Sequence, residues 1–266
     1  LTGYFNIPKV FELTLNNGYD KVSKKQLGLQ LGYAADFKTY DELFDAFKKQ
    51  MKYFIDVKIQ GSNIIEKIFA DCMPAPFLSI LTNDCIAKGK DYNAGGARYN
   101  TKYLQGVGIG TITDCLAAVK YNVYDKKNFT MDELMAALDD NFIGHERILN
   151  LVKNHSPKYG NDDEYADEIM KQVFEYYQGE VTGRPNMLGG MYRVNMLPTT
   201  CHVYFGEVMM ASANGRLAHV PVSEGISPEK GADVNGPTAV IKSCAKMDHL
   251  MTGGTLLNQK FTPSVV

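Results

Sequence analysis

The chain has 266 residues, enough to bury a sizeable core, and no clear linker divides it, so we expect one domain over residues 1–266. Its 28 basic side chains nearly balance 30 acidic ones, which favours neither nucleic acid nor an anionic membrane as a partner. No apolar run approaches the roughly 18 residues of a membrane helix and no signal peptide is visible, so we expect a cytoplasmic protein. Five scattered cysteines without a CxxC pair indicate reduced thiols, not disulfides or a zinc site.

Both ends of the chain read as cuts through structured protein. The sequence begins at Leu1, without Met, directly in "LTGYFNIPKV", and it ends in "LLNQKFTPSVV" with no polar tail. We therefore expect a fragment of a longer polypeptide.

The first two-thirds of the chain has the pattern of helices. Asn6 is placed to cap a helix with Pro8 in its first turn, and Gly18 is placed to close it. A capping box at Thr39-x-x-Glu42 predicts the start of a long amphipathic helix, with an interruption expected at Gly61.

Pro74 and Pro76 predict a turn, and a short helix should follow and stop near Gly89. A second capping box, Thr130-x-x-Glu133, predicts another helix. Further helices are expected over 162–177, where the acidic run "NDDEY" suits a helix N-terminus, and over "GPTAVIKSCAKM".

The run "YRVNMLPTTCHVYFGEVMM", residues 192–210, has the most strand-like composition in the chain. In a strand, Thr199 and Cys201 would share one face and His202 would point to the other. Neighbours on opposite faces cannot pair as a nucleophile and its base, so we do not predict a Cys201–His202 dyad.

Two glycine-rich stretches invite functional interpretations. "GVGIGTITD", residues 106–114, could cradle a dinucleotide pyrophosphate, but its third glycine is displaced and "ARYNTKYLQ" before it is not an apolar parallel strand. We favour a packing loop that leads into a helix. In "DYNAGGARYN", residues 91–100, we favour a structural turn over an anion site at Arg98. The five histidines are dispersed and predict no metal site.

Several blocks together, in order and covering essentially the whole chain, resemble glycyl radical enzymes, the family of pyruvate formate-lyase and of glycerol and diol dehydratases. Within the family they are most similar to trans-4-hydroxy-L-proline dehydratases. The blocks include "GYFNIPKVFELTLNNG", "DYNAGGARYNTKYLQGVGIGTITD", "NMLPTTCHVYFG", "VSEGISPEKGADVNGPTAVIKS" and "GGTLLNQKFTP".

The resemblance implies an α/β fold, namely part of a ten-stranded pyruvate formate-lyase-like barrel with surrounding helices. It implies a radical lyase that works anaerobically and eliminates water from a small hydroxylated substrate. A glycyl radical, installed by a partner radical-SAM activating enzyme, passes to a cysteine whose thiyl radical removes a hydrogen atom from the substrate. The intact protein is expected to be a homodimer without a bound metal.

The family's cysteine motif and glycyl loop are both missing from this sequence, and none of its cysteines matches the catalytic one. The resemblance therefore places no catalytic residue in this chain, and we expect the chain alone to be inactive. It places two residues in the substrate pocket, Tyr4 and a barrel-strand threonine, Thr199. Without the resemblance, Tyr4 could equally anchor the first helix, and Thr199 would be interpreted as a strand hydroxyl bonded to a carbonyl.

Three alternatives remain open. The parent could be another glycyl radical enzyme, such as a glycerol dehydratase or a formate C-acetyltransferase. The chain could instead be a non-catalytic module that binds or completes another chain. A dinucleotide-binding oxidoreductase based on "GVGIG" has the least support.

Overall fold

The computed structural model describes residues 3–261. Its centre is a four-stranded, wholly parallel sheet in the order β1-β4-β5-β6, formed by β1 (Gly3–Asn6), β4 (Lys102–Val107), β5 (Tyr192–Met196) and β6 (Thr252–Thr255). A separate hairpin pairs β2 (Tyr19–Asp20) with β3 (Lys25–Gln26). Neighbouring strands of the parallel sheet are far apart in sequence, so helical segments connect them.

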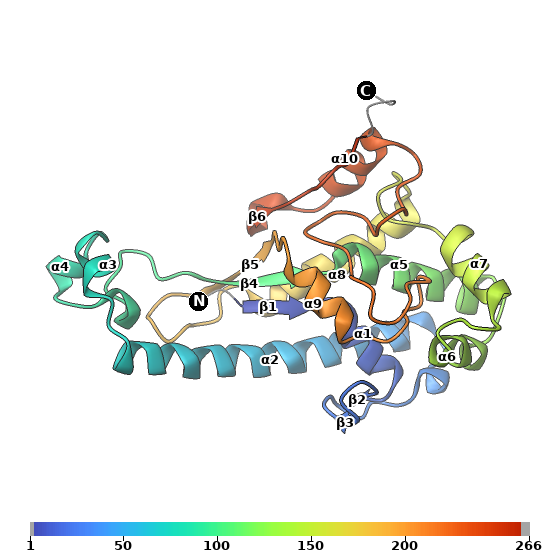
Figure 1. Ribbon diagram of the computed structural model, residues 1–266, viewed down its shortest axis with the longest axis horizontal. Helices are drawn as coiled ribbons and strands as arrows, with labels where there is room; N and C mark the ends of the chain where they lie inside the picture. Colours follow the sequence, from blue (N-terminus) through green and yellow to red (C-terminus); the bar gives the residue numbers. More distant parts are fainter. Residues whose placement is uncertain (1–2, 262–266) are drawn as a thin grey trace.

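Figure 1 shows the long helix α2 running below the sheet and α8 crossing behind it. The α-helices are α1 (Ile7–Leu15), α2 (Tyr40–Cys72), α3 (Pro76–Ile80), α4 (Cys85–Lys88), α5 (Ile109–Val119), α6 (Met131–Asp139), α7 (Glu146–Asn154), α8 (Glu164–Val181), α9 (Cys201–Glu207) and α10 (Pro237–Ala245). Short 3₁₀ turns occupy η1 (Ala34–Asp36), η2 (Tyr92–Ala94) and η4 (His249–Met251), and η3 (Lys120–Asp125) is a π-helical turn.

The helix starts predicted from capping residues are confirmed. The Asn6 side chain accepts a hydrogen bond from the Lys9 amide (3.2 Å) at the start of α1, and Thr130 and Glu133 form a complete capping box on α6. At α2, Thr39 caps the Glu42 amide, but the Glu42 carboxylate accepts from Lys38 instead of completing the box.

The interruption expected at Gly61 is wrong, because α2 continues for 33 residues to Cys72. One interior glycine costs a helix only about 1 kcal/mol, and the buried stripe of α2 outweighs that cost.

Two strand assignments are also corrected. The segment before "GVGIG" is a parallel strand after all: β4 lies between β1 and β5. The run 192–210 is not one strand, since β5 ends at Met196, Pro198 follows, and Cys201 begins α9. Proline has no amide hydrogen for a ladder, and a short apolar run fits a helix as well as a strand.

Candidate functional site

The register of the parallel strands brings polar side chains together on one face of the sheet. Tyr4 of β1 lies beside Gln105 of β4, which lies beside Asn195 of β5. One step towards the strand N-termini, Tyr103 pairs with Arg193. Because side chains alternate along strands, these five residues share one face, which we call the polar face.

The other face of the sheet carries the apolar positions and packs on helices. The Phe5 ring of β1 packs against the Tyr177 ring of α8, with the ring centroids 5.4 Å apart and the ring planes tilted by 31°. A Cβ placed on Gly106 would lie 2.6 Å from the Met196 sulfur and 3.1 Å from the Tyr177 ring. Parallel sheets usually bury apolar residues on both faces, so a polar row on one face is a functional signal.

Gln105 and Asn195 have unusual surroundings on this face. Gln105 is only 7% exposed, yet its Oε1 has no hydrogen-bond partner among residues 3–261. Within the same described residues, Asn195 Oδ1 is likewise buried without a partner. Gly253 of β6 leaves space here, since a side chain on it would collide with the Tyr103 ring and with Asn195 Oδ1. An unpaired buried acceptor costs about 1–3 kcal/mol, so two in adjacent positions need an explanation.

The structure places Tyr4 on the polar face, with 45% of the residue exposed. Thr199 is not in a strand, which corrects the expectation of a strand threonine. It is an exposed bend residue between β5 and α9. Two strand spacings, about 10 Å, separate β1, which holds Tyr4, from β5, which Thr199 follows in the chain. Their roles in a substrate pocket stay a prediction.

Cys201 and His202 lie in the first turn of α9, so the strand argument against a dyad does not apply to them. Cys201 packs with Val107, Met209 and Val222 in a small apolar cluster, and burial raises the pKa of its thiol. The His202 ring lies 3.9 Å from Glu224 along a groove of about 580 Å³ formed with the 220–233 loop. Because its neighbours are apolar, the Cys201 thiol is held in its neutral form and not as the reactive thiolate.

The N-terminus of α5, where "GVGIG" suggested a phosphate, is filled by the chain itself. The Thr111 amide donates to the Ser223 hydroxyl (3.0 Å), and the Thr111 hydroxyl bonds the Glu229 carboxylate. A Cβ on Gly110 would lie 2.6 Å from the Ser227 carbonyl oxygen, so this glycine permits close packing of the 222–229 loop. The packing role predicted for this stretch is confirmed, but the stretch is not a loop, because Gly106 and Val107 belong to β4 and Ile109 begins α5.

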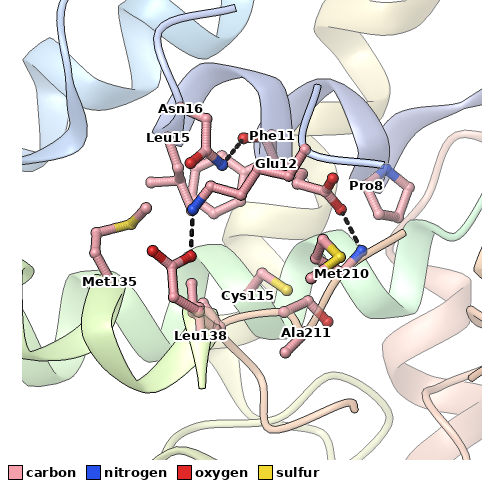
Figure 2. Close-up of a pocket in the computed structure, with 14 residues that line it drawn as sticks. Pro8, Phe11, Glu12, Leu15, Asn16, Cys115, Met135, Leu138, Met210 and Ala211 are labelled. Atoms are coloured by element: carbon pink, nitrogen blue, oxygen red, sulfur yellow. Dashed lines mark hydrogen bonds and ion pairs between the residues drawn. The ribbon is translucent and has the colours of Figure 1, made fainter. Parts of the chain in front are cut away.

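A second cavity, enclosed by α1, α5, α6 and the 210–213 segment, is too small for a substrate. Figure 2 shows Glu12 turned towards Met210, whose amide donates to its carboxylate at 3.0 Å. The volume is about 20 Å³, the size of a water molecule. Burial raises the pKa of Glu12, while Lys9 at 2.6 Å opposes that rise.

Residues 3–261 contain neither a cluster of metal ligands nor a helix that could span a membrane. Nowhere in this range do three or more His, Cys, Asp or Glu side chains gather as a metal centre. No helix in the same range is long and apolar enough to cross a membrane.

A parallel sheet with helices on one face and a polar row on the other is what the expected barrel wall requires. Residues 1–206 match the Pyruvate formate lyase-like family, and residues 222–266 match the Glycine radical family. The chain therefore belongs to the Pyruvate formate lyase-like family, and the expectation of an α/β fold of this barrel type is confirmed by its structural neighbours.

Among its relatives, the chain is 69% identical over its full length to trans-4-hydroxy-L-proline dehydratase of Clostridioides difficile, of which it covers 34%. The structure of that dehydratase with trans-4-hydroxy-L-proline bound superposes with a TM-score of 0.96 at 68% identity, over 98% of this chain and 33% of that one. The structure of the glycerol dehydratase of Clostridium butyricum superposes with a TM-score of 0.93 at 40% identity, over 98% of this chain and 33% of that one. The (2S)-3-sulfopropanediol dehydratase of Klebsiella oxytoca is 35% identical over 99% of this chain and 33% of that protein.

The chain thus spans about a third of the length of these relatives. Gln105 and Asn195 were missed at the level of sequence. For Asn195 a signal was present in "YRVNM", where apolar and polar residues alternate, whereas "KYLQGV" shows no such alternation around Gln105.

Proposed function

We propose that this chain is the segment of a glycyl radical dehydratase that forms part of the substrate chamber, and that the substrate is trans-4-hydroxy-L-proline. The observation that carries the proposal is 69% identity to a dehydratase of that substrate over every residue of this chain. The other dehydratases compared, which act on glycerol or sulfopropanediol, are 40% and 35% identical.

In this proposal the chain supplies the chamber wall, and a glycyl radical elsewhere in the parent supplies hydrogen-atom abstraction through a cysteine. Tyr4 and Thr199 hydrogen-bond the substrate, and the sheet holds Tyr4 in a fixed orientation. Residues 1–266 act as a single partial domain. Its support is one apolar core that joins Ile226, Val240 and Met247 to residues of the first 200 positions.

The finer parts of the proposal concern the parent's environment. The parent works anaerobically in the cytoplasm, forms a homodimer and receives its radical from a radical-SAM activating enzyme. A glycerol or diol dehydratase is the second candidate, supported by the TM-score of 0.93 to the glycerol enzyme.

The test uses the activated full-length protein. Tyr4→Phe and Thr199→Ala should each lower turnover of trans-4-hydroxy-L-proline about tenfold or more, since each removes a hydrogen bond to the reacting molecule. Matched controls on the exposed surface are Tyr99→Phe and Thr101→Ala. Electron paramagnetic resonance measures the radical content of every variant.

Unchanged turnover at equal radical content would refute the pocket roles of Tyr4 and Thr199. Turnover of glycerol but not of trans-4-hydroxy-L-proline by the unmutated protein would refute the substrate and favour the second candidate.

A further inference from the structure

The polar face contains two amide side chains that the chain's own contacts do not explain. Gln105 and Asn195 are register partners on adjacent strands, and each has a buried oxygen without a hydrogen-bond partner among residues 3–261. Gln105 is more than nine-tenths buried. Folded proteins rarely leave such groups unpaired unless a ligand or another group completes them.

Both amides point away from the helical core. Leu104 and Val194, the residues just before them, are fully buried on the opposite face, so strand alternation turns Gln105 and Asn195 to the side of Tyr4. Gly253, on the neighbouring strand, keeps the space beside Asn195 free of a side chain.

From this geometry we infer that Gln105 and Asn195 are substrate-positioning residues whose amide oxygens accept hydrogen bonds from the hydroxyl or ammonium group of a small polar substrate. The inference rests on the proposed function, because it needs the polar face to be the wall of the chamber. In addition to the contact proposed for Tyr4, it gives the chamber two fixed hydrogen-bond acceptors, which select a ligand that carries hydrogen-bond donors. An apolar analogue of the same shape would leave both oxygens unpaired and bind poorly.

Binding to the full-length protein without its radical separates this role from turnover. Gln105→Leu and Asn195→Leu, made separately, should each lower the affinity for trans-4-hydroxy-L-proline about tenfold or more. Isothermal titration calorimetry measures this affinity. The melting temperature without ligand should stay the same or rise, because each change removes an unpaired buried acceptor. Gln172→Leu and Asn150→Leu, on exposed helix positions of α8 and α7, are the matched controls and should leave affinity unchanged.

Unchanged affinity in both chamber variants overturns the inference. A lowered melting temperature also overturns it, since it shows that the amides pair with other protein groups, such as a loop inserted into the barrel. If the unmutated protein binds glycerol and not trans-4-hydroxy-L-proline, the proposed substrate fails. In that case the inference is tested with glycerol: it holds if Gln105→Leu and Asn195→Leu lower the affinity for glycerol, and it fails if they do not.

Discussion

Asp114 in α5 gives a prediction that tests the buried electrostatics. Its side chain is fully buried, Oδ1 accepts a hydrogen bond from the Tyr159 amide (2.9 Å), and Oδ2 lies 3.9 Å from the Lys158 ammonium. Burial raises the pKa of Asp114 to about 7, although Lys158 and the Tyr159 amide oppose that rise. We predict that Asp114→Asn stabilises the protein at neutral and alkaline pH.

The sign follows from proton binding. Between its unfolded pKa of 3.8 and its folded pKa of about 7, Asp114 binds more protons in the folded state. Stability therefore falls as pH rises through this interval, and the loss is complete above pH 7. At ~1.4 kcal/mol per pKa unit, the loss is at most about 4 kcal/mol. The asparagine variant cannot ionise and has no such loss, so above pH 7 we expect it to be more stable by up to about 4 kcal/mol.

The measurement is urea unfolding of the full-length protein and of the variant at pH 5, 6, 7 and 8. The stability difference should favour the variant increasingly up to pH 7 and then level off. Asp132→Asn, at an exposed position of α6, is the control and should give a difference that is constant over this range. A constant difference for Asp114→Asn would contradict the reasoning, because it would mean that Asp114 is ionised throughout.

Three further predictions concern packing and solubility. Gly106→Ala should lower the free energy of unfolding by about 1–3 kcal/mol, since its Cβ would meet Met196 and Tyr177; an unchanged urea midpoint would contradict this. Tyr159→Phe should cost about 1–2 kcal/mol by removing the 2.9 Å bond to the Ile226 carbonyl, and equal melting temperatures would speak against it. This chain expressed alone should be poorly soluble, because β1 and β6 are open sheet edges; a cooperatively melting monomer by ultracentrifugation and calorimetry would refute that.

What could be predicted from the sequence was mostly local. The caps at Asn6 and Thr130 were correct because a side chain that bonds an amide three residues on needs no tertiary context. The segment after Pro198 was assigned wrongly because its aromatic and branched residues suit a strand, whereas packing makes it α9. There Gly206 lies against the backbone at Val220, too close for a Cβ, and this long-range contact leaves no local trace.

The candidate site was harder to predict, because it depends on register. Tyr4, Gln105 and Asn195 are separated by about a hundred residues each and meet through strand pairing. The resemblance to glycyl radical enzymes suggested Tyr4 as a pocket residue without that information, since a family motif carries the register implicitly. It identified no amide, although Gln105 and Asn195 both lie within blocks that carry the resemblance.

The polar face also explains why this sheet does not look like an ordinary parallel sheet. Helices cover both faces of most parallel sheets, and their strands are apolar throughout. Here helices α2 and α8 cover one face (Figure 1). The opposite face carries two phenols, two amides and a guanidinium. Such a face is stable if it meets water or a polar ligand, and Gln105, which is 7% exposed, is already largely shielded from water. A barrel that closes around this face would shield it further from water. A bound polar molecule would then supply the hydrogen bonds that the side chains of the polar face lack.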